Sequence, residues 1–432
     1  MRKAINIVLV LLMMFSFSSF INAQTSEDKV WFNGQARSYF ARDVLGNITD
    51  TLYPRNASNG YNLVDLNTHV NPIDNIEIFA QLRVRNQFGS FFGSGTNIEV
   101  RQLKASGTIN NKFNFSIGDI FLKQNRFTLF NYGEELSSLE NDMFKPYRDI
   151  IHYENFYNDN RWRLQGLQTD FSLYFDRFIR TLEFDFFLTR PKGSTQIGFN
   201  SYSPDLLISG GSMVSKLTHQ LSYEANFTNF FEVPTSGNVN ISIRNPVYHS
   251  ALVYQYDINN VVLKHKIQSG YSKRDWLFTE LNNNKTDSVS NSTRGMFFEF
   301  ENEYLIKDSS FRLVLGARYV DPNFRSAGAQ TKRVNFASES RNTVYPFHTN
   351  DYITRPTSVF DLLTDESRFN QNLSGTLMSY NPLYSNVLPY GDATPNRMGL
   401  YLSSKLNKNQ ILVSNINSCL LYTSDAADDW FC

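Results

Sequence analysis

The sequence predicts an all-β protein whose strands form a transmembrane antiparallel β-barrel. Three observations favour this fold: short stretches in which apolar and polar residues alternate, short polar turns between pairs of such stretches, and a 15% aromatic content beside a mean hydropathy of −0.36. Side chains alternate along a strand, so each stretch presents one apolar and one polar face. A strand that separates lipid from water requires such a pair of faces.

The stretch TLEFDFFL, Thr181 to Leu188, shows the alternation clearly. In a buried strand of a soluble protein, each of its two carboxylates would have to be paired or protonated, because burying a charge costs several kcal/mol. A strand between lipid and water avoids this cost, since the carboxylates then face water. The lipid-facing set would be Leu182, Phe184, Phe186 and Leu188, and the water-facing set would be Glu183, Asp185 and Phe187.

The amino end predicts export. A basic start, Met1-Arg2-Lys3, precedes an apolar stretch from Ile5 to Phe20 and a small residue, Ala23. This order is typical of a signal peptide over residues 1–23, used in Sec-type export to the outer membrane. The alternative, a single membrane anchor, is disfavoured because the stretch falls short of the ~20 residues that a span needs. No Cys lies near residue 24, which argues against a lipid-anchored start.

From residue 24 onward, the alternating segments can be paired into hairpins. Asn110-Asn111 suits a two-residue turn, and longer polar turns such as Asp257 to Asn260 join other pairs. The segments make about fifteen strands, each near the ~10 residues that a tilted membrane strand requires. Their predicted bounds are 30–41, 62–70, 76–86, 97–109, 112–122, 164–175, 178–188, 211–217, 220–231, 248–256, 261–271, 295–306, 311–320, 398–406 and 411–416.

Long connections alternate with the short turns. In outer-membrane barrels short turns face the periplasm and long loops face outside, which predicts a first strand that runs outward. Single-chain bacterial barrels have even strand numbers, so we predict about 16–18 strands when complete, with this chain truncated at the C-terminal end. A miscounted strand near 200–230 is the alternative. The predicted long loops are 42–61, 124–163, 190–210, 229–247, 272–294 and 321–396.

The last residues break the preceding pattern. The stretch CLLYTSDAADD, Cys419 to Asp429, resembles the in-frame translation of a transposase adapter used in sequencing libraries. The predicted organisation is a signal peptide over 1–23, an incomplete outer-membrane barrel over 24–418 and a non-native tail over 419–432. A genuine irregular terminus is the alternative. Both cysteines, Cys419 and Cys432, lie in this tail, so the rest of the chain has neither a disulfide framework nor a cysteine metal site.

The polar faces of the predicted strands carry charges of both signs. The expected turns place Glu303 opposite Arg312 and Asp65 across from Gln81, as cross-strand neighbours. Such a wall suits a water-filled pore whose charges bias ion passage, or a closed lumen filled by ion pairs. A barrel of this size favours the pore, because side chains alone hardly fill it. The predicted pore-lining residues are Asp65, Glu77, Arg83, Arg85, Asp170, Glu183, Asp185, Lys264, Lys266, Glu299, Glu301, Glu303, Arg312 and Arg318.

The predicted loop 124–163 is long, rich in Tyr and Phe, and charged in both signs. It would narrow the lumen if it folds inward, or form part of the outer surface if it stays at the barrel mouth. The segment 321–396 is a second candidate lid or ligand-binding element. The candidate constriction residues are Asp142, Arg148, Glu154, Arg161 and Arg163.

Composition and motifs argue against several other functions. The 41 basic and 41 acidic residues form no basic stripe with interleaved aromatics, so we expect no nucleic acid to bind. Six scattered histidines show neither metal-ligand spacing nor a nucleophile motif, so we expect no enzyme, metal or cofactor, with a hydrolase on the barrel wall as the weaker alternative. The expected partners are outer-membrane lipid, small hydrophilic solutes and the barrel-assembly machinery. The oligomeric state stays open.

The signal-peptide end INAQ, the Asn- and Phe-rich strands and the passage QLRVRNQFGSFFGSG resemble the outer-membrane β-barrel proteins of the Bacteroidota. The resemblance is architectural and spans about Val30 to Asn417. It implies a porin-like envelope barrel of a Gram-negative cell and names no substrate. Large receptor-type transporters carry a plug domain before the barrel, whereas here the first predicted strand follows Gln24 closely.

Two hypotheses follow from these observations. The first is a porin-like channel for passive diffusion of small hydrophilic solutes, which the density of inward charge favours. The second is a non-conducting surface barrel that acts through its long extracellular loops as an adhesin or as a component of a secretion or gliding apparatus, which the size of the loop 321–396 favours.

Overall fold

The computed structural model contains a sheet of fifteen strands in which each strand pairs with its neighbours in the order of the sequence, apart from a short two-stranded insertion. The all-β class and the predicted number of strands are therefore confirmed. The chain divides into two compact units, residues 1–107 and 108–432. The structure describes residues 29–45, 55–88, 95–130, 153, 163–176, 179–193, 196–198, 201–202, 205–233, 239–282, 285–308, 310–329, 391–408 and 412–422.

The first unit is an antiparallel meander with one apolar and one polar face. Its strands are β1 (Val30–Leu45), β2 (Arg55–Ile73), β3 (Ile76–Gln87) and most of β4 (Thr96–Ile109). On the polar face Asp65 lies opposite Arg83 rather than Gln81. The pairing differs from the predicted one because β2 continues to Ile73, three residues beyond its predicted end, so that only Asp74 and Asn75 form the turn. The Asp65–Arg83 pair is bidentate, with two N–O distances of 2.6 Å, and both side chains are buried.

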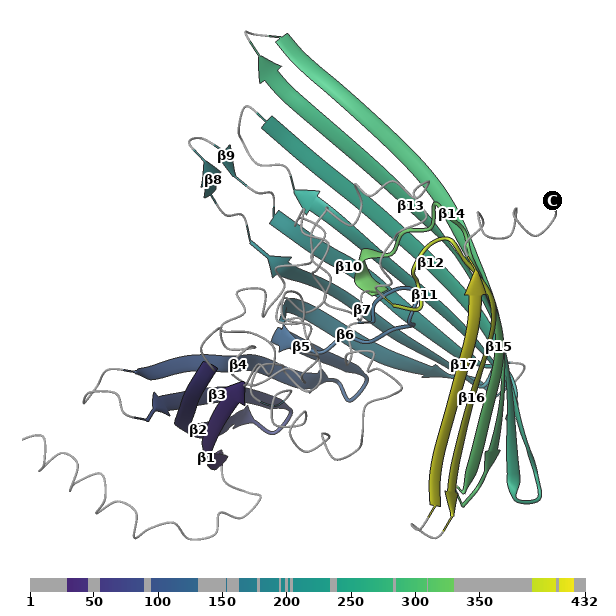
Figure 1. Cartoon of the computed structure of the whole chain (residues 1–432), viewed down its shortest axis with the longest axis horizontal. Coiled ribbons are helices and arrows are strands. Elements are labelled where there is room, and N and C mark those ends of the chain that lie inside the picture. The colour runs from purple at the N-terminus through teal and green to yellow at the C-terminus, as the bar shows by residue number, and fades with distance from the viewer. Residues whose placement is uncertain are drawn as a thin grey trace, which may run out of the picture. The chain divides into compact units, whose positions relative to one another are not determined.

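The second unit contains the remaining strands, which form a curved sheet from β5 to β17 with short connecting segments on its concave face (Figure 1). A separate pair, β8 (Gln196–Gly198) and β9 (Ser201–Tyr202), and a 3₁₀ turn, η3 (Ala327–Ala329), complete it. The strands are β5 (Phe113–Ile120), β6 (Leu164–Tyr174), β7 (Thr181–Lys192), β10 (Asp205–Lys216), β11 (Leu221–Val233), β12 (Val239–Ile258), β13 (Val261–Asn282), β14 (Lys285–Ile306), β15 (Phe311–Val320), β16 (Arg397–Lys408) and β17 (Leu412–Tyr422).

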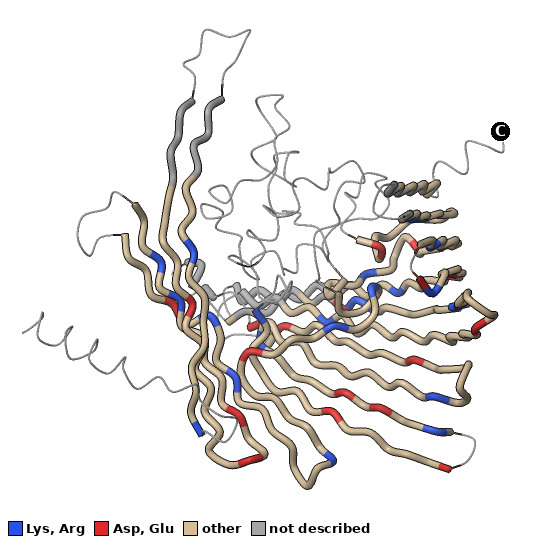
Figure 2. The backbone as a smooth tube through the Cα atoms, turned by 90° about the horizontal axis from the view of Figure 1, so that it is seen from below, with Lys and Arg blue, Asp and Glu red and all other residues tan. Residues whose placement is uncertain are grey.

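The two faces of these strands differ in polarity as the alternation predicts. In β7, Phe186 and Leu188 are 46% and 48% exposed, while Phe187 between them is 6% exposed. The exposed face carries aromatic contacts between strands, such as Phe171 on Phe184, whose ring centroids are 5.1 Å apart. Charged residues of both signs are spread along the strands, as Figure 2 shows. The strands of the second unit thus have an apolar face open to the surroundings and a face rich in polar groups.

Several predicted boundaries are wrong. The predicted loop 272–294 is mostly strand, because β13 and β14 pair without a break from Val261 opposite Ile306 to Asn282 opposite Lys285. Parts of the predicted loops 190–210 and 229–247 likewise belong to β10, β11 and β12. The strict alternation of short turns with long loops therefore fails at the β13–β14 hairpin. In the other direction, β5 ends at Ile120 instead of Leu122, because the chain leaves the sheet there.

The turns and the ends of the chain show what the remaining predictions depend on. Asn110 and Asn111 both have φ = 53°, as the two central residues of a tight hairpin turn require. At the carboxyl end β17 continues through Tyr422, so the strand crosses the predicted boundary at 418. The predicted signal peptide and the residues after 422 lie outside the described residues. Within the described residues, no helix is both long and apolar enough to cross a membrane.

Candidate functional site

Three non-strand segments of the second unit lie against the polar face of its sheet; we call them the inserted segments. They are 121–130, 321–329 and 391–396. Backbone hydrogen bonds join them: Phe130 N donates to Gly328 O at 2.8 Å, and Asn396 N donates to Asp321 O at 3.4 Å. The inserted segments therefore form one layer over part of this face, although Arg126 and Asp392, which they bring together, are 266 positions apart in the chain.

An apolar contact anchors this layer to the sheet. The ring of Phe127 stacks on Phe297 of β14 with centroids 3.9 Å apart, and Phe324 meets the same ring edge-on at 5.2 Å. All three side chains are buried. Burial of aromatic rings supplies most of the attraction, at roughly 25 cal/mol per Å² of apolar surface. The contact brings the neighbouring polar residues of segment 121–130 onto the wall.

A partly buried cluster of charges lies beside the Phe127 ring. Arg126 donates through Nη2 to Glu299 at 2.9 Å and to Glu301 at 2.6 Å, and through Nη1 to Asp392 at 3.2 Å. Arg318 of β15 donates through Nε to Glu299 at 2.7 Å and through Nη1 to Asp392 at 2.8 Å. The Glu299 side chain is fully buried. Two guanidinium groups thus bridge three carboxylates that come from the sheet and from segment 391–396; we call these five residues the Arg126 cluster.

Neutral groups complete the hydrogen bonding of the Arg126 cluster. The Tyr401 hydroxyl lies 3.0 Å from Glu299 Oε1 and 2.7 Å from Glu301 Oε2, and it can donate to one of them at a time. Gly316, opposite Tyr401 in the neighbouring strand, leaves the space that the tyrosine ring fills. Gln268 also donates to Glu299 and accepts from Asn125 at 2.9 Å. A buried charge is tolerated when its bonding capacity is met in this way.

The electrostatics of the inserted segments agree with fully ionised groups. Burial alone would raise the pKa of the Asp392 carboxyl, but the guanidinium groups of Arg318 and Arg126 outweigh burial and hold this pKa below its usual range. Burial alone would lower the pKa of Arg126, but the carboxylates of Glu299, Asp392 and Glu301 outweigh it and keep this pKa above its usual value. Both groups therefore stay charged at neutral pH, and their attraction holds the inserted segments on the wall.

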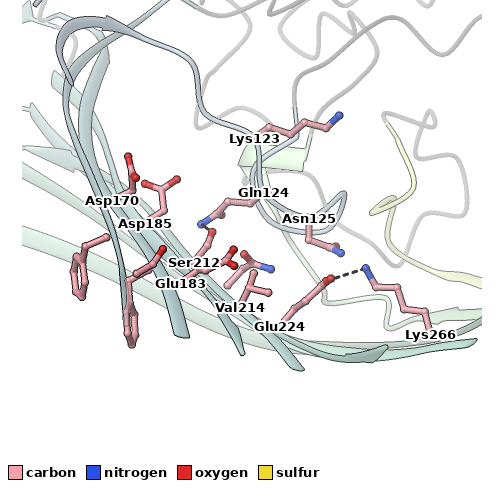
Figure 3. A pocket seen from close by; sticks show the side chains of 14 residues that line it. Lys123, Gln124, Asn125, Asp170, Glu183, Asp185, Ser212, Val214, Glu224 and Lys266 are labelled. Carbon is pink, nitrogen blue, oxygen red and sulfur yellow. Dashed lines mark hydrogen bonds and ion pairs between the residues drawn. The ribbon is translucent and has the colours of Figure 1, made fainter. Parts of the chain in front are cut away.

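An open pocket lies on the same polar face, over β6, β7, β10, β11 and β13 (Figure 3). Its volume is about 430 Å³. Segment 121–130 contributes part of its rim, where Gln124 donates to Gly211 O at 2.8 Å and accepts from Thr228. The charged residues at its wall are Lys123, Asp170, Glu183, Asp185, Glu224 and Lys266, and its amide and hydroxyl residues are Gln124, Asn125, Asn226, Ser172 and Ser212.

The structure sorts the predicted pore-lining residues into groups. Asp170, Glu183, Asp185 and Lys266 line the pocket. Glu299 and Arg318 are 0% and 7% exposed, so the inserted segments cover them, with Glu301 beside them. In the first unit Asp65 and Arg83 are buried against each other, Arg85 lies over the Tyr61 ring, and Glu77 is 2.6 Å from His69. The remaining predicted residues on β13 to β15 are Lys264, Glu303 and Arg312.

The predicted pairing of Glu303 with Arg312 needs a correction. Glu303 lies opposite Val314 and Arg312 lies opposite Leu305, so the register is shifted by two residues. The two side chains still meet diagonally, with Arg312 Nε 2.5 Å from Glu303 Oε1. Both side chains keep some exposure, and Arg312 is more than half exposed. This ion pair therefore differs from the Arg126 cluster, in which Glu299 and Arg318 are buried.

Of the predicted constriction residues, only Arg163 falls within the described residues. It donates to both carboxylate oxygens of Asp119 at 2.8 and 3.0 Å, next to the sheet. Asp142, Arg148, Glu154 and Arg161 lie outside the described residues. Among the described residues, no group of three or more His, Cys, Asp or Glu side chains is placed to hold a metal ion.

The sequence analysis did not single out Arg126, Asp392 and Tyr401. A signal for Arg126 was present: in FLKQNRFTLF an arginine directly precedes the apolar-rich run FTLF, shortly after a strand. A buried arginine needs carboxylate partners, which the glutamates of β14 offer. Asp392 had no such signal, because a GDATPN segment reads as an ordinary turn.

Comparison with known proteins gives only structural likenesses. No protein-family model matches the sequence, and no curated protein does. OmpT expressed in the outer membrane of Vibrio cholerae is 13% identical, over 69% of this chain and 89% of that chain, with a TM-score of 0.27. Salmonella typhi OmpF is 13% identical, over 69% and 93%, with a TM-score of 0.23. A triple mutant of the Rhodopseudomonas blastica porin is 8% identical, over 67% and 94%, with a TM-score of 0.24. At these scores the likeness carries no functional information.

Proposed function

We propose that this chain forms an outer-membrane β-barrel channel that passes small hydrophilic solutes by passive diffusion. The observation that carries this proposal is the opposite polarity of the two faces of the strands. Phe186, Leu188 and Phe298 are about half exposed on one face, whereas Glu183, Asp185 and Glu224 line an open pocket on the other. A sheet between lipid and an aqueous lumen has this distribution.

The inserted segments suggest how the lumen would be narrowed. The Arg126 cluster and the Phe127 contact hold segment 121–130 on the polar face, so the amino-terminal part of the predicted loop 124–163 lies on the wall. In the proposed channel this segment reduces the free cross-section beside the pocket. The residues that line the pocket, together with Glu303 and Arg312, are then the ones that solutes and ions meet.

The channel is tested by reconstitution. Full-chain protein, shown to be folded by its heat-shifted gel mobility, is added to planar lipid bilayers, and single-channel current is recorded at moderate salt. Uniform, stable current steps are expected. Replacing Arg312, whose side chain is more than half exposed, with Glu should raise the preference for cations, because a charge at a lumen wall biases ion passage. Silence from folded protein would reject the channel.

The second candidate function is a surface barrel that binds a partner outside the cell. The β13–β14 hairpin favours it, since each strand has 22 residues where a membrane crossing needs about 10, and the surplus would project beyond the bilayer. An adhesin or a component of a secretion or gliding apparatus would use such a projection. A folded but non-conducting protein in the bilayer experiment is the result that favours this function.

A further inference from the structure

The pocket contains more negative than positive charge, and the excess lies in one place. Four carboxylates and two ammonium groups stand at its wall. Glu224 pairs with Lys266 at 3.2 Å, and Glu183 pairs with Lys216 at 2.9 Å. Figure 3 shows the Lys123 side chain pointing away from the remaining two carboxylates, those of Asp170 and Asp185. The excess negative charge therefore belongs to this pair.

Asp170 and Asp185 lie directly opposite each other on β6 and β7. Like charges in such cross-strand positions repel. Their hydrogen bonds come from neutral amides: Asn114 donates to Asp170 at 2.7 Å, and Gln168 donates to both oxygens of Asp185 at 3.0 and 3.2 Å. Within the described part of the chain, neither carboxylate is in an ion pair. A cation placed between them would relieve a repulsion that the protein itself leaves in place.

The size and rigidity of the pocket suit an organic cation. A volume of about 430 Å³ lies within the range of roughly 300–1,000 Å³ that small-molecule sites occupy. The rim is held in place, because Gln124 bonds to Gly211 and Thr228, and Asn125 bonds to Gln268. The far wall carries the Glu224–Lys266 pair and Ser212, which can bond to hydroxyl or amino groups. A pre-organised site of this kind loses little entropy on binding.

We propose that this pocket is a binding subsite for small hydrophilic amines, with the ammonium group held between Asp170 and Asp185 and the rest of the solute directed toward the Glu224–Lys266 pair. The subsite deepens the proposed channel function by naming a class of solute, and it rests on that function for its biological access. Charge-assisted hydrogen bonds from an ammonium to two carboxylates would supply the specificity.

Isothermal titration calorimetry on the folded, detergent-solubilised full chain tests the subsite. The probe is 1,4-diaminobutane at low ionic strength, and 1,4-butanediol is its neutral counterpart. Saturable binding of the diamine is expected, with a Kd at least about tenfold weaker for the double variant Asp170→Asn/Asp185→Asn. The matched control is Asp257→Asn, which removes a carboxylate that pairs with Lys307 away from the pocket and should leave the Kd unchanged.

Several outcomes would overturn the subsite: no diamine binding by the parent chain, an unchanged Kd in the double variant, equal binding of the diol, or binding of Mg²⁺ alone. Heat-shifted mobility establishes whether each variant is folded, and Asp→Asn keeps the size and the acceptor oxygen of the side chain. Conduction without diamine binding would reject the subsite only. Diamine binding by a protein that does not conduct would reject the channel and leave the pocket as a site of another function.

Discussion

The polar face of the second unit differs between its two regions. Over β14 and β15 the inserted segments cover it, and Glu299 is fully buried among two guanidinium groups, a tyrosine hydroxyl and an amide. Over β6 and β7 the face stays open, and Asp185 receives hydrogen bonds from the Gln168 amide alone among the described residues. Both carboxylates stand on strands with the same alternation of apolar and polar residues.

The two regions differ because the inserted segments bring positive charge to Glu299 and bring none to Asp185. Arg126, which is 173 positions away in the chain, supplies half of the positive charge around Glu299, and Arg318 on the neighbouring strand supplies the rest. No guanidinium reaches Asp185 from a described residue. Removing a charge in the covered region should therefore leave a buried ion uncompensated, whereas removing one in the open region should relieve repulsion. The two regions are thus expected to respond in opposite directions.

The largest effect is expected from Arg126→Met, which keeps much of the side-chain volume and removes the charge. Glu299 and Asp392 would then keep only Arg318, Glu301 would lose its guanidinium partner, and breaking a buried ion pair from one side costs about 3–5 kcal/mol. Because the Arg126 side chain is 27% exposed, we expect a loss of about 3 kcal/mol. The free energy of unfolding in urea, followed by heat-shifted gel mobility, measures it.

Arg312→Met is the matched control for this variant. Arg312 pairs with Glu303 at 2.5 Å, but its side chain is 54% exposed, so solvent screens the pair. Exposed ion pairs contribute about 0–1 kcal/mol, and the control should stay within that range. A similar small loss in both variants would mean that the Arg126 cluster does not hold the inserted segments in place.

Acid should also lower the free energy of unfolding through the covered region, by less than Arg126→Met does. The pKa of Asp392 is lower in the folded protein than its ordinary value, since Arg318 and Arg126 stabilise the carboxylate. Its contribution is therefore complete above the ordinary Asp pKa of about 3.9 and disappears as the pH falls through the lower folded value. Urea unfolding at pH values from neutral to strongly acidic should show this loss, and Asp392→Asn should remove the part due to this group. An identical acid profile in the variant would contradict the assignment.

The strands were predictable because they depend on local alternation. The run Thr181 to Leu188 carries its own two faces, and Asn110-Asn111 carries its own turn, so neither needs distant information. The register was less predictable. Asp65 pairs with Arg83 instead of Gln81 because β2 continues to Ile73, and the side-chain alternation does not show where that strand ends. The length of β13 and β14 was missed because residues 279–294, at the hairpin end of the two strands, contain few apolar residues and show no alternation.

The inserted segments show why the candidate site was only partly predictable. Sequence placed Glu299 and Arg318 on the polar face, but a face can meet water or other protein, and the strand pattern is the same in both cases. Whether the polar face meets water or protein depends on contacts such as that of Arg126 with Asp392, which are 266 positions apart in the chain. Asp170 and Asp185 were predictable as polar-face residues, and their position opposite each other followed once the hairpin register was known.

The smallest effect, and the one with the opposite sign, is expected for Asp185→Asn. The asparagine carbonyl can still accept a hydrogen bond from Gln168, and its neutral side chain no longer repels Asp170 across the two strands. Like-charge cross-strand pairs cost a fraction of a kcal/mol, so we expect unfolding to become harder by about 0.2–1 kcal/mol, with Glu299→Gln as the destabilising counterpart. Urea unfolding of the two variants measures both signs. If Asp185→Asn destabilises the protein as Glu299→Gln does, the open carboxylates are structural and the distinction between the two regions fails. If Asp185→Asn stabilises the protein, the parent chain keeps the repulsion between Asp170 and Asp185 at a cost to its stability, as expected of a cation-binding site.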